Sequence, residues 1–363
     1  MAQRTPLYDV HRRLGARMVD FAGWEMPVSY GDAADEHRAV RGACGIFDVS
    51  HMGQLRLRGA AAATVWQRLT TNDVRRLADG GAQYTLACAA DGGIRDDLIL
   101  YRLSAAEWLA IVNACNTPAM AAWVGGQSGA EAAFADESPE WALLALQGPR
   151  ALEIARDLAR VDPSQPPFTI RPGAIDGIPV QVSRTGYTGE DGFEVLVPAT
   201  EAVRVWDRLC DGVLAAGGHP AGLAARDTLR LEAALPLCGS DMGPDVSPLQ
   251  AGLGWAVRFV EGNDFVGRRA LEAERGAGVR RRLVCFELDD GGGVPRHGYE
   301  VRHAGVRIGE VTSGARSPSL GRFIGMGYVA SEWAEPGTSI EVVVRGRASQ
   351  ARVVPRPFYR RAG

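Results

Sequence analysis

The sequence contains no lysine, because all 40 of its basic residues are arginine. A genome with arginine-biased codon usage is one explanation for this absence. Whatever the cause, the chain cannot form a Schiff base with pyridoxal phosphate, supply the lysine of a P-loop or carry a lipoyl arm, since each of these requires a lysine side chain. Three classes of chemistry are therefore excluded.

Cysteine is also scarce, and long apolar runs are missing. The six cysteines are scattered along 363 residues and never form the close pairs that metal sites and redox motifs use. We expect buried thiols in a reducing compartment. No apolar run reaches the ~18–20 residues of a membrane span, and the first residues lack the apolar core of a signal peptide. These features predict a cytoplasmic protein that does not bind membranes.

The charge balance argues against polyanionic partners. The formal net charge is -3, whereas nucleic acids and anionic membranes attract proteins with a clear basic excess. We therefore expect no nucleic-acid partner. With 46% hydrophobic and 23% charged residues, the composition is that of a folded globular protein. At roughly 100–200 residues per domain, the length favours two or three domains.

Hydrophobic periodicity predicts mixed helices and strands up to about residue 260. Predicted helices cover residues 8–14, 33–41, 60–69, 117–124, 150–158, 200–215 and 224–235, and predicted strands cover 54–58, 98–101, 108–113, 142–146, 180–184 and 193–197. The last two strands flank a glycine-rich turn and predict a hairpin. The remainder of the first fifty residues is predicted to be mostly loop. Residues 268–279 are predicted to be a linker, and alternating segments after Gly291 predict a small β-barrel or sandwich.

Several segments combine glycine, aromatic and ionisable residues in a way that packing alone does not require. They are residues 19–27 (VDFAGWEMP), 47–53 (FDVSHMG), 92–98 (GGIRDDL), 186–194 (GYTGEDGFE) and 222–233 (GLAARDTLRLEA). In this order they resemble the signature segments of the glycine cleavage T-protein, an aminomethyltransferase. The resemblance extends to residues 5–7, 146–149, 264–267, 312–314 and 317–318, so it spans nearly the whole chain.

The resemblance implies a specific reaction. Family members transfer the one-carbon unit of an S-aminomethyl-dihydrolipoyl carrier, the H-protein, to tetrahydrofolate, with release of ammonia and formation of 5,10-methylenetetrahydrofolate. The expected partners are thus folate and a lipoylated carrier protein. Tetrahydrofolate acts as acceptor substrate, and no metal, flavin or pyridoxal phosphate is expected.

The resemblance also implies the architecture. The expected fold is α+β, with three domains in a cloverleaf around a central folate channel and a C-terminal β-barrel of jelly-roll-like type. The first domain is expected to be discontinuous, comprising residues 1–54 and 140–245. The second comprises residues 55–139 and 246–278, and the barrel comprises 279–363.

Asp97 is the predicted catalytic residue. The resemblance places the second aspartate of Asp96-Asp97 beside the folate nitrogens, where a carboxylate can stabilise cationic charge and help to manage a proton. Loss of ammonia from an S-aminomethyl group generates such charge. Asp96, which is adjacent on a strand, is expected to point to the opposite face and to have a structural task. Turn capping is the alternative for the pair.

Glu194 is predicted to hold the edge of the pterin ring. A carboxylate that faces the 2-amino and N–H groups accepts two parallel hydrogen bonds. The resemblance assigns this contact to the second glutamate of residues 186–194. Glu194 also opens an apolar strand, where an unpaired inward carboxylate is unfavourable. The alternative is a side chain that faces solvent at the hairpin end.

Four more residues are predicted near the ring. Tyr187, Tyr84 and Met52 offer flat or polarizable surface to it, although each of these residue types is common in protein cores. Asn113 matches a family position close to folate.

Arg226 is predicted to donate to a pterin carbonyl or to meet the anionic glutamate tail. A helix-surface ion pair with Asp227 or Glu232 is the alternative. His51 is interpreted as a hydrogen-bonded structural residue and is left out of the catalytic set. Cys238 occupies a position where many family members have tyrosine, so any hydrogen bond of that tyrosine is missing here.

The competing functions are less well supported by the sequence. The related demethylating oxidases carry a flavin-binding portion, for which this chain has neither spare length nor a Gly-x-Gly-x-x-Gly fingerprint. Related iron-sulfur accessory proteins use a Lys-Gly-Cys signature, which a chain without lysine cannot contain. An S-adenosylmethionine methyltransferase would require a glycine-rich strand-to-helix turn that is missing. The main alternative is a folate-binding accessory or regulatory protein of the same fold without transferase activity.

Overall fold

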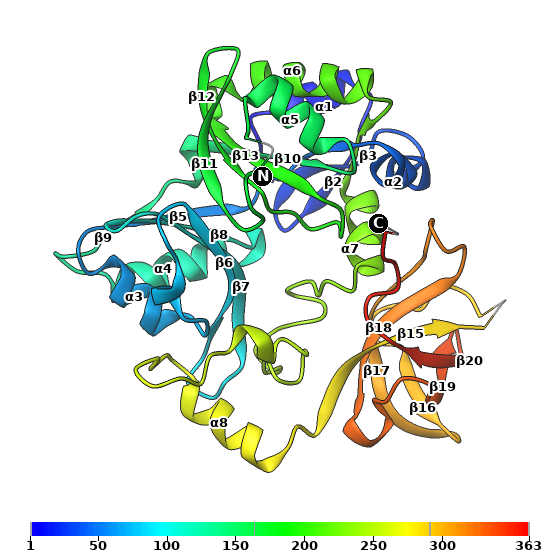
Figure 1. Cartoon of the computed structure of the whole chain (residues 1–363). Helices are drawn as coiled ribbons and strands as arrows, with labels where there is room; N and C mark the ends of the chain where they lie inside the picture. The colour runs from blue at the N-terminus through cyan, green and yellow to red at the C-terminus, as the bar shows by residue number, and fades with distance from the viewer. Residues whose placement is uncertain (1, 163, 290–291, 362–363) are drawn as a thin grey trace. The chain divides into compact units, whose positions relative to one another are not determined.

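The structure is a computed structural model that describes residues 2–162, 164–289 and 292–361. The chain forms two compact units (Figure 1). One comprises Met1–Thr85 and Asp97–Arg226, and the other comprises Leu86–Asp96 and Asp227–Gly363. In the part of the chain that is described, no helix has the length and apolar character needed to cross a bilayer. The division into three domains remains a prediction.

A six-stranded sheet, ordered β11-β12-β13-β10-β4-β14, organises the first unit. Its strands are β4 (Gly45–Asp48), β10 (Trp141–Gln147), β11 (Ile170–Ile175), β12 (Ile178–Ser183), β13 (Gly192–Pro198) and β14 (His219–Pro220). Strand β10 is antiparallel to both of its neighbours, β13 and β4. All of its residues after Trp141 are buried, which explains why the strand reads as a continuous apolar run rather than an alternating one.

Amphipathic helices cover this sheet. Helices α5 (Ala151–Ala159) and α6 (Ala202–Ala215) run along one face in Figure 1. Ile154, Trp206 and Leu209 belong to the same buried core as the sheet residues, with Trp206 fully excluded from solvent. Burying such large apolar side chains contributes roughly 1.5–3 kcal/mol each. The spacing of apolar residues in the sequence therefore predicts both helices correctly.

The N-terminal region contains a small sheet that the sequence analysis predicted as loop. Strands β1 (Gln3–Arg4), β2 (Arg17–Phe21) and β3 (Trp24–Ser29) form it in the order β1-β3-β2. Helix α1 (Tyr8–Arg13) lies between β1 and β2 in the chain, and helix α2 (Ala33–Gly42) follows β3. The loop prediction is wrong because β2 is largely exposed and shows no alternation of buried and exposed residues. Its turn, Ala22-Gly23, has positive φ at both positions, as tight hairpins require.

A five-stranded sheet, ordered β6-β7-β8-β5-β9, includes the segment that contains Asp97. Its strands are β5 (Gly53–Arg58), β6 (Gly81–Cys88), β7 (Ile94–Ser104), β8 (Glu107–Val112) and β9 (Ala133–Asp136), and the associated helices are α3 (Ala62–Leu69) and α4 (Thr117–Gln127). Trp66 in α3 and Val124 in α4 are fully buried. The antiparallel register pairs Ile99 with Ile111, which brings the start of β7 alongside the end of β8.

The second unit contains a closed barrel, ordered β15-β18-β17-β16-β19-β20. Its strands are β15 (Arg281–Leu288), β16 (Glu300–His303), β17 (Val306–Arg316), β18 (Phe323–Ala330), β19 (Ser339–Val344) and β20 (Arg347–Val354). Phe286, Val301 and Val342 are buried in its core. The predicted α+β class with a C-terminal β-barrel is confirmed. Helix α7 (Leu223–Glu232) begins in the first unit and ends in the second.

The predicted linker is a helix. Residues 268–279 are largely occupied by α8 (Arg268–Ala277). Their charged composition suits a solvent-facing helix that is anchored by one apolar residue, Leu271, which is only 1% exposed. Arg268 and Glu272, one turn apart, form an ion pair at 2.9 Å. The linker prediction is wrong because a helix with one buried apolar residue shows almost no hydrophobic periodicity.

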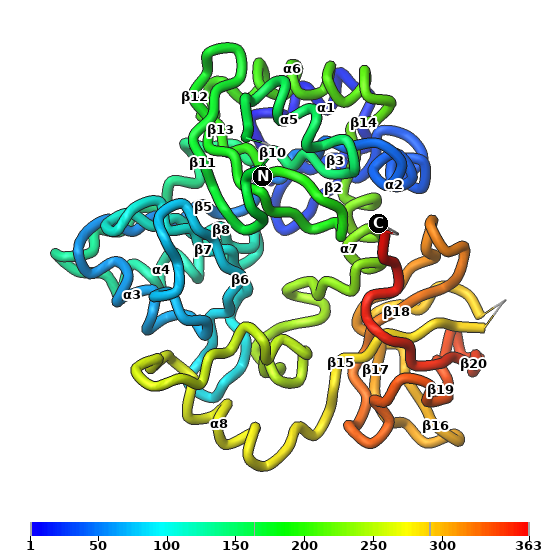
Figure 2. The backbone as a smooth tube through the Cα atoms, viewed as in Figure 1, coloured from blue at the N-terminus to red at the C-terminus, as the bar shows by residue number. Residues whose placement is uncertain are grey.

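A buried glutamine shapes the glycine-rich turn between β12 and β13, two strands whose backbone path is drawn in Figure 2. Gln147, at the end of β10, donates from Nε2 to the Thr185 carbonyl at 3.1 Å and accepts from the Thr188 hydroxyl at 2.9 Å. A side chain on Gly186 or Gly192 would overlap the Gln147 amide. The two glycines therefore let the backbone wrap closely around this group, which fixes the turn.

We expect Gln147→Ala to lower the free energy of unfolding by about 2–4 kcal/mol, because the buried Thr185 carbonyl loses its Gln147 donor and the buried Thr188 hydroxyl loses its acceptor. Urea unfolding followed by circular dichroism measures the effect. Gln181→Ala is the matched control, since Gln181 lies in β12 of the same hairpin and its side chain forms no hydrogen bond within the described residues. Equal stability of the two variants would contradict the prediction.

Candidate functional site

Three of the predicted residues meet at the start of β7. Asp97 is half-buried there, and the Tyr84 hydroxyl of β6 donates to its Oδ2 at 2.9 Å. Asn113, which follows β8, donates from Nδ2 to Asp97 Oδ1 at 2.8 Å and to the Asp97 carbonyl at 3.0 Å. The three residues come from neighbouring strands, and they form one hydrogen-bonded cluster.

The surroundings of Asp97 alter its acidity. Burial raises the pKa of the Asp97 carboxyl, and the hydrogen bonds from Tyr84 and Asn113 lower it without cancelling that effect. Among the described residues, no positively charged group contributes to this shift of the Asp97 pKa. A carboxyl with a raised pKa takes up a proton more readily than an ordinary aspartate, as a group that handles a proton in a reaction must. The geometry is thus compatible with the predicted role of Asp97.

The supporting residues are themselves anchored locally. Asn72 donates from Nδ2 to the Tyr84 carbonyl at 3.0 Å, and its backbone N–H donates to the Thr85 hydroxyl, also at 3.0 Å. On the other side, the Thr117 hydroxyl at the start of α4 donates to the Asn113 carbonyl at 3.1 Å. These contacts fix the backbone at Tyr84 and Asn113, so both side chains approach Asp97 from fixed positions.

A second cluster gathers Glu194, Arg226 and Tyr187. Glu194 on β13 is half-buried and accepts a hydrogen bond from the Thr185 hydroxyl. The Arg226 guanidinium carbon lies 4.8 Å above the centre of the Tyr187 ring, within the range of a cation–π contact. Burial lowers the pKa of Arg226, whereas the charges of Glu194 and Tyr187 raise it. The carboxylate and the guanidinium therefore lie in each other's field.

The alternative pairing of Arg226 is not formed. Within the described residues it makes no ion pair with Asp227 or Glu232, and Asp227 is instead bound by Arg230 at 2.8 Å. Arg226 is neither an exposed helix-surface arginine nor fully satisfied, because its Nη1 atom is buried and has no hydrogen-bond partner. Such an atom is unusual in folded proteins and calls for an explanation.

A buried carboxylate positions the helix that carries Arg226. Glu36 of α2 accepts from the backbone N–H of Gly222 at 2.8 Å, immediately before α7, and from the N–H groups of Tyr30 and Gly31. A side chain on Gly222 would overlap the Val28 carbonyl, so only glycine fits this approach. The start of α7 is therefore tied to the N-terminal segment.

An arginine supports the turn that carries Tyr187. Arg41, which is 8% exposed, donates to the Thr188 carbonyl at 2.9 Å and to Glu190 at 2.8 Å. Met52 is half-buried just before β5. Because Gly53 pairs with Val112, Met52 lies next to Asn113 along this pair of strands. All seven predicted residues thus lie in the first unit, and their roles remain predictions.

His51 differs from the sequence interpretation. It is 4% exposed, its ring meets Phe21 edge-on at 5.6 Å, and within the described residues neither ring nitrogen forms a hydrogen bond. The interpretation as a hydrogen-bonded residue is therefore wrong. Burial, followed by the nearby charge of Arg226, lowers the pKa of His51 to about 4, although Asp48 opposes the shift. The imidazole is neutral at physiological pH. The sequence feature that could have pointed to His51 as a residue near the site is its position next to Met52, a predicted site residue.

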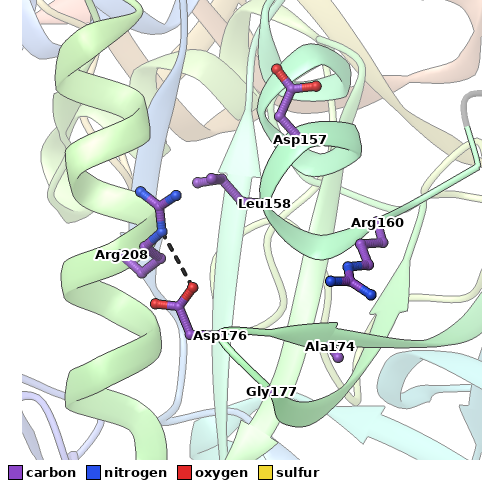
Figure 3. A pocket seen from close by; sticks show the side chains of 7 residues that line it. All are labelled: Asp157, Leu158, Arg160, Ala174, Asp176, Gly177 and Arg208. Carbon is purple, nitrogen blue, oxygen red and sulfur yellow. Dashed lines mark ion pairs between the residues drawn. The ribbon is translucent and has the colours of Figure 1, made fainter.

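A surface hollow of the first unit involves none of these residues (Figure 3). It lies where α5 ends, beside the turn between β11 and β12, and Arg160, Asp176 and Arg208 line it. Arg208 and Asp176 face each other across it at 3.5 Å. Its charged side chains are exposed and of both signs, so the hollow shows no preference for a ligand of one charge.

Two family models account for most of the chain. The GCVT N-terminal domain matches residues 7–261, and the glycine cleavage T-protein C-terminal barrel domain matches residues 281–360. The second match coincides with the closed barrel of the structure. The fold and these matches define a class of proteins in which an α+β portion is followed by a small barrel.

Full-length relatives narrow this class. Aminomethyltransferases from Desulfitobacterium hafniense (strain Y51) and Bacillus subtilis (strain 168) are 45% and 42% identical to the chain, covering 99% of it and 99% and 100% of their own lengths. The crystal structure of glycine cleavage system aminomethyltransferase T from Bartonella henselae superposes with a TM-score of 0.92 at 33% identity, covering 99% of this chain and 98% of that one. The chain therefore belongs to the glycine cleavage T-protein family of aminomethyltransferases. The predicted family and the predicted transferase class are confirmed.

We expect Tyr84→Phe to raise the pKa of Asp97 further, because it removes a hydrogen bond that favours the charged carboxylate, an interaction of about 1.5–3 kcal/mol. The pKa of Asp97 is already higher in the folded state than in the unfolded state. The free energy of unfolding therefore falls as the pH rises from the unfolded-state pKa to the folded-state pKa of Asp97. The variant extends this pH range upwards. Carboxyl-carbon NMR titration measures the shift. Tyr101→Phe is the control, because Tyr101 lies on β7 as Asp97 does, but its hydroxyl is hydrogen-bonded to Ser183 and Thr185. An unchanged or lowered pKa in Tyr84→Phe would refute the assignment.

Proposed function

We propose that the chain transfers the one-carbon unit of an S-aminomethyl-dihydrolipoyl carrier protein to tetrahydrofolate and uses Asp97 and Glu194 to do so. In this reaction the carbon forms two bonds to folate nitrogens while its bonds to sulfur and to the amino nitrogen break. The two N–H protons of folate end on the thiol and on ammonia, so the reaction is balanced without an oxidant or reductant.

The observation that carries the proposal is that Glu194 lies within the electrostatic field of Arg226, whose guanidinium lies over the face of Tyr187. The amino-pyrimidinone edge of a pterin presents N–H donors next to a carbonyl acceptor. A carboxylate accepts from the donors, and an adjacent guanidinium donates to the carbonyl. Tyr187, which lies under Arg226, offers a flat surface of the size of one ring. This arrangement matches the hydrogen-bonding pattern of the pterin edge.

Asp97 supplies the second requirement, a carboxylate close to developing positive charge. Departure of ammonia leaves a cationic carbon centre, which a negative group stabilises when solvent is excluded. The raised pKa of Asp97 also suits it to receive a proton from an attacking folate amine and to pass it on. Tyr84 and Asn113 hold the carboxylate in one orientation, so that it does not have to reorganise during the reaction.

Folate is proposed to act as substrate, with no metal, flavin or pyridoxal phosphate. The missing lysine removes the group that would bind pyridoxal phosphate covalently. The proposed partner is a lipoylated carrier, in keeping with the glycine cleavage family to which the chain belongs. A folate-binding regulator without activity is the less favoured function, because full-length relatives are aminomethyltransferases. The cytoplasmic location stays a prediction.

We expect Asp97→Asn to reduce the turnover number at least ~100-fold, the usual range for loss of a general acid-base group, while the dissociation constant of tetrahydrofolate changes by less than about threefold. Methylenetetrahydrofolate formation from aminomethylated carrier protein measures turnover, and calorimetry measures binding. Asp79→Asn, which alters an exposed carboxylate paired with Arg102, is the control. Near-normal turnover of Asp97→Asn would remove Asp97 from this role.

For Glu194→Gln we expect the dissociation constant of tetrahydrofolate to increase roughly 10- to 100-fold. The substitution replaces two charge-assisted hydrogen bonds by one neutral hydrogen bond, and the glutamine NH2 group then faces an N–H donor of the pterin edge. The control variant is Glu153→Gln, at an exposed carboxylate that pairs with Arg150. Unchanged affinity in Glu194→Gln, with wild-type protein binding normally, would show that another residue recognises the pterin edge.

A further inference from the structure

Three buried hydroxyl groups lie together beside Glu194. The hydroxyl oxygen of Thr185 lies 2.6 Å from that of Ser183 and 3.2 Å from that of Tyr101, and Ser183 donates to Tyr101 at 3.0 Å. Each of the three residues is at most 8% exposed. Thr185 also donates to Oε2 of Glu194. The hydroxyl cluster is therefore connected to the carboxylate through Thr185.

The carboxylate sets the direction of these hydrogen bonds. A carboxylate only accepts, whereas a hydroxyl group has a single proton to donate. Because the Thr185 proton points to Glu194, the Thr185 oxygen is left to accept from Ser183 and from Tyr101. Burial raises the pKa of Tyr101, and the nearby charge of Glu194 raises it further, so the phenol keeps its proton and remains a donor.

The cluster joins two sheets of the first unit. Ser183 pairs with Glu194 across β12 and β13, so the two side chains leave the same face of the six-stranded sheet. Tyr101 belongs to β7 of the five-stranded sheet, the strand that also contains Asp97. Residues four apart on a strand point to the same face and are separated by about 13 Å along it. Through Tyr101, the Glu194 carboxylate is tied to the strand that carries Asp97.

We propose that Thr185, backed by Ser183 and Tyr101, is a positioning residue that holds Glu194 in the orientation that binds the pterin edge. This inference rests on the proposed folate-binding function of Glu194. A glutamate side chain has several rotatable bonds, and fixing them before binding reduces the entropy that is lost when a ligand binds. Thr185 therefore acts on affinity through Glu194 and does not itself contact the ligand.

The hydrogen bonds of Glu194 leave room for the ligand. Thr185 holds Oε2, whereas Oε1 forms no hydrogen bond within the described residues and is not shielded from solvent. Each carboxylate oxygen can accept more than one hydrogen bond. Oε1 and the remaining lone pair of Oε2 are therefore available to two N–H donors of the pterin edge.

A double-mutant cycle on tetrahydrofolate binding, measured by calorimetry, tests the proposal. We expect Thr185→Val, which removes the hydroxyl and keeps the shape, to raise the dissociation constant about tenfold. In the Glu194→Met background, the same change has no further effect, because the carboxylate that it positions is gone. Thr185→Ser keeps the hydroxyl and restores affinity to within about threefold of wild type. Thr70→Val, which removes another buried hydroxyl of this unit, one bound to the Trp66 carbonyl at 2.8 Å, leaves binding unaltered.

A second variant decides the matter if Thr185→Val does not fold, which its thermal unfolding midpoint shows. Tyr101→Phe leaves the Thr185 hydroxyl in place and removes one donor to its oxygen. We expect it to raise the dissociation constant about threefold, and again to have no further effect in the Glu194→Met background. Wild-type affinity in Tyr101→Phe, when Thr185→Val is unfolded, overturns the positioning role.

The positioning role and the proposed function fail in different ways. If Thr185→Val binds tetrahydrofolate as wild type does, or if its effect and that of Glu194→Met multiply independently, the positioning role is overturned and the proposed function stands. Independent effects are those expected of a purely structural threonine, which weakens binding equally in both backgrounds. If Glu194→Met itself binds as tightly as wild type, the proposed function of Glu194 at the pterin edge is overturned.

Discussion

The half-buried guanidinium of Arg226 is the charge around which the candidate site of the first unit is arranged. A buried charge is unfavourable unless an opposite charge and hydrogen bonds surround it. Arg226 has Glu194 within its field and the face of Tyr187 beneath it, but its Nη1 remains unsatisfied. The position of β13, the wrapped turn around Gln147 and the anchoring of α7 by Glu36 all keep these groups together. The Nη1–H group is a donor that could bind a ligand carrying an oxygen or nitrogen acceptor.

Two carboxylates in one unit acquire different chemical characters from their surroundings. Asp97 is held by two neutral donors, Tyr84 and Asn113, and burial raises its pKa. Glu194 has a hydroxyl partner, Thr185, and a nearby cation, Arg226. A carboxyl without a cation suits proton transfer, and one beside a cation suits ligand binding as an anion. The division of roles that we propose thus follows from environment, since the two side chains have nearly the same intrinsic acidity.

Much of the fold was accessible from local patterns. Helices such as α6 have a broad apolar face, and the strands β12 and β13 flank an unmistakable glycine-rich turn. The N-terminal sheet was not predicted, because β2 buries little and its pairing depends on β3 rather than on its own alternation. Helix α8 was missed for a related reason: a single buried leucine, Leu271, gives almost no periodic signal. Elements that bury few apolar residues carry the weakest local signature.

By itself the sequence determined the mixed helices and strands, the all-β character of the C-terminal region and the segments that contain the candidate residues, because these depend on periodicity, turn chemistry and contiguous motifs. The α+β class and the closed barrel were implied by the family resemblance of those motifs. Only the tertiary structure decided which polar atoms have hydrogen-bond partners. Tyr84 and Asn113 lie 13 and 16 positions from Asp97, and Gln147 lies 41 from Thr188. Likewise, the alternatives for Arg226 and His51 could be separated only once their neighbours were known. Hydrogen-bond partners and burial are properties of chain segments brought together by packing, so no local pattern encodes them.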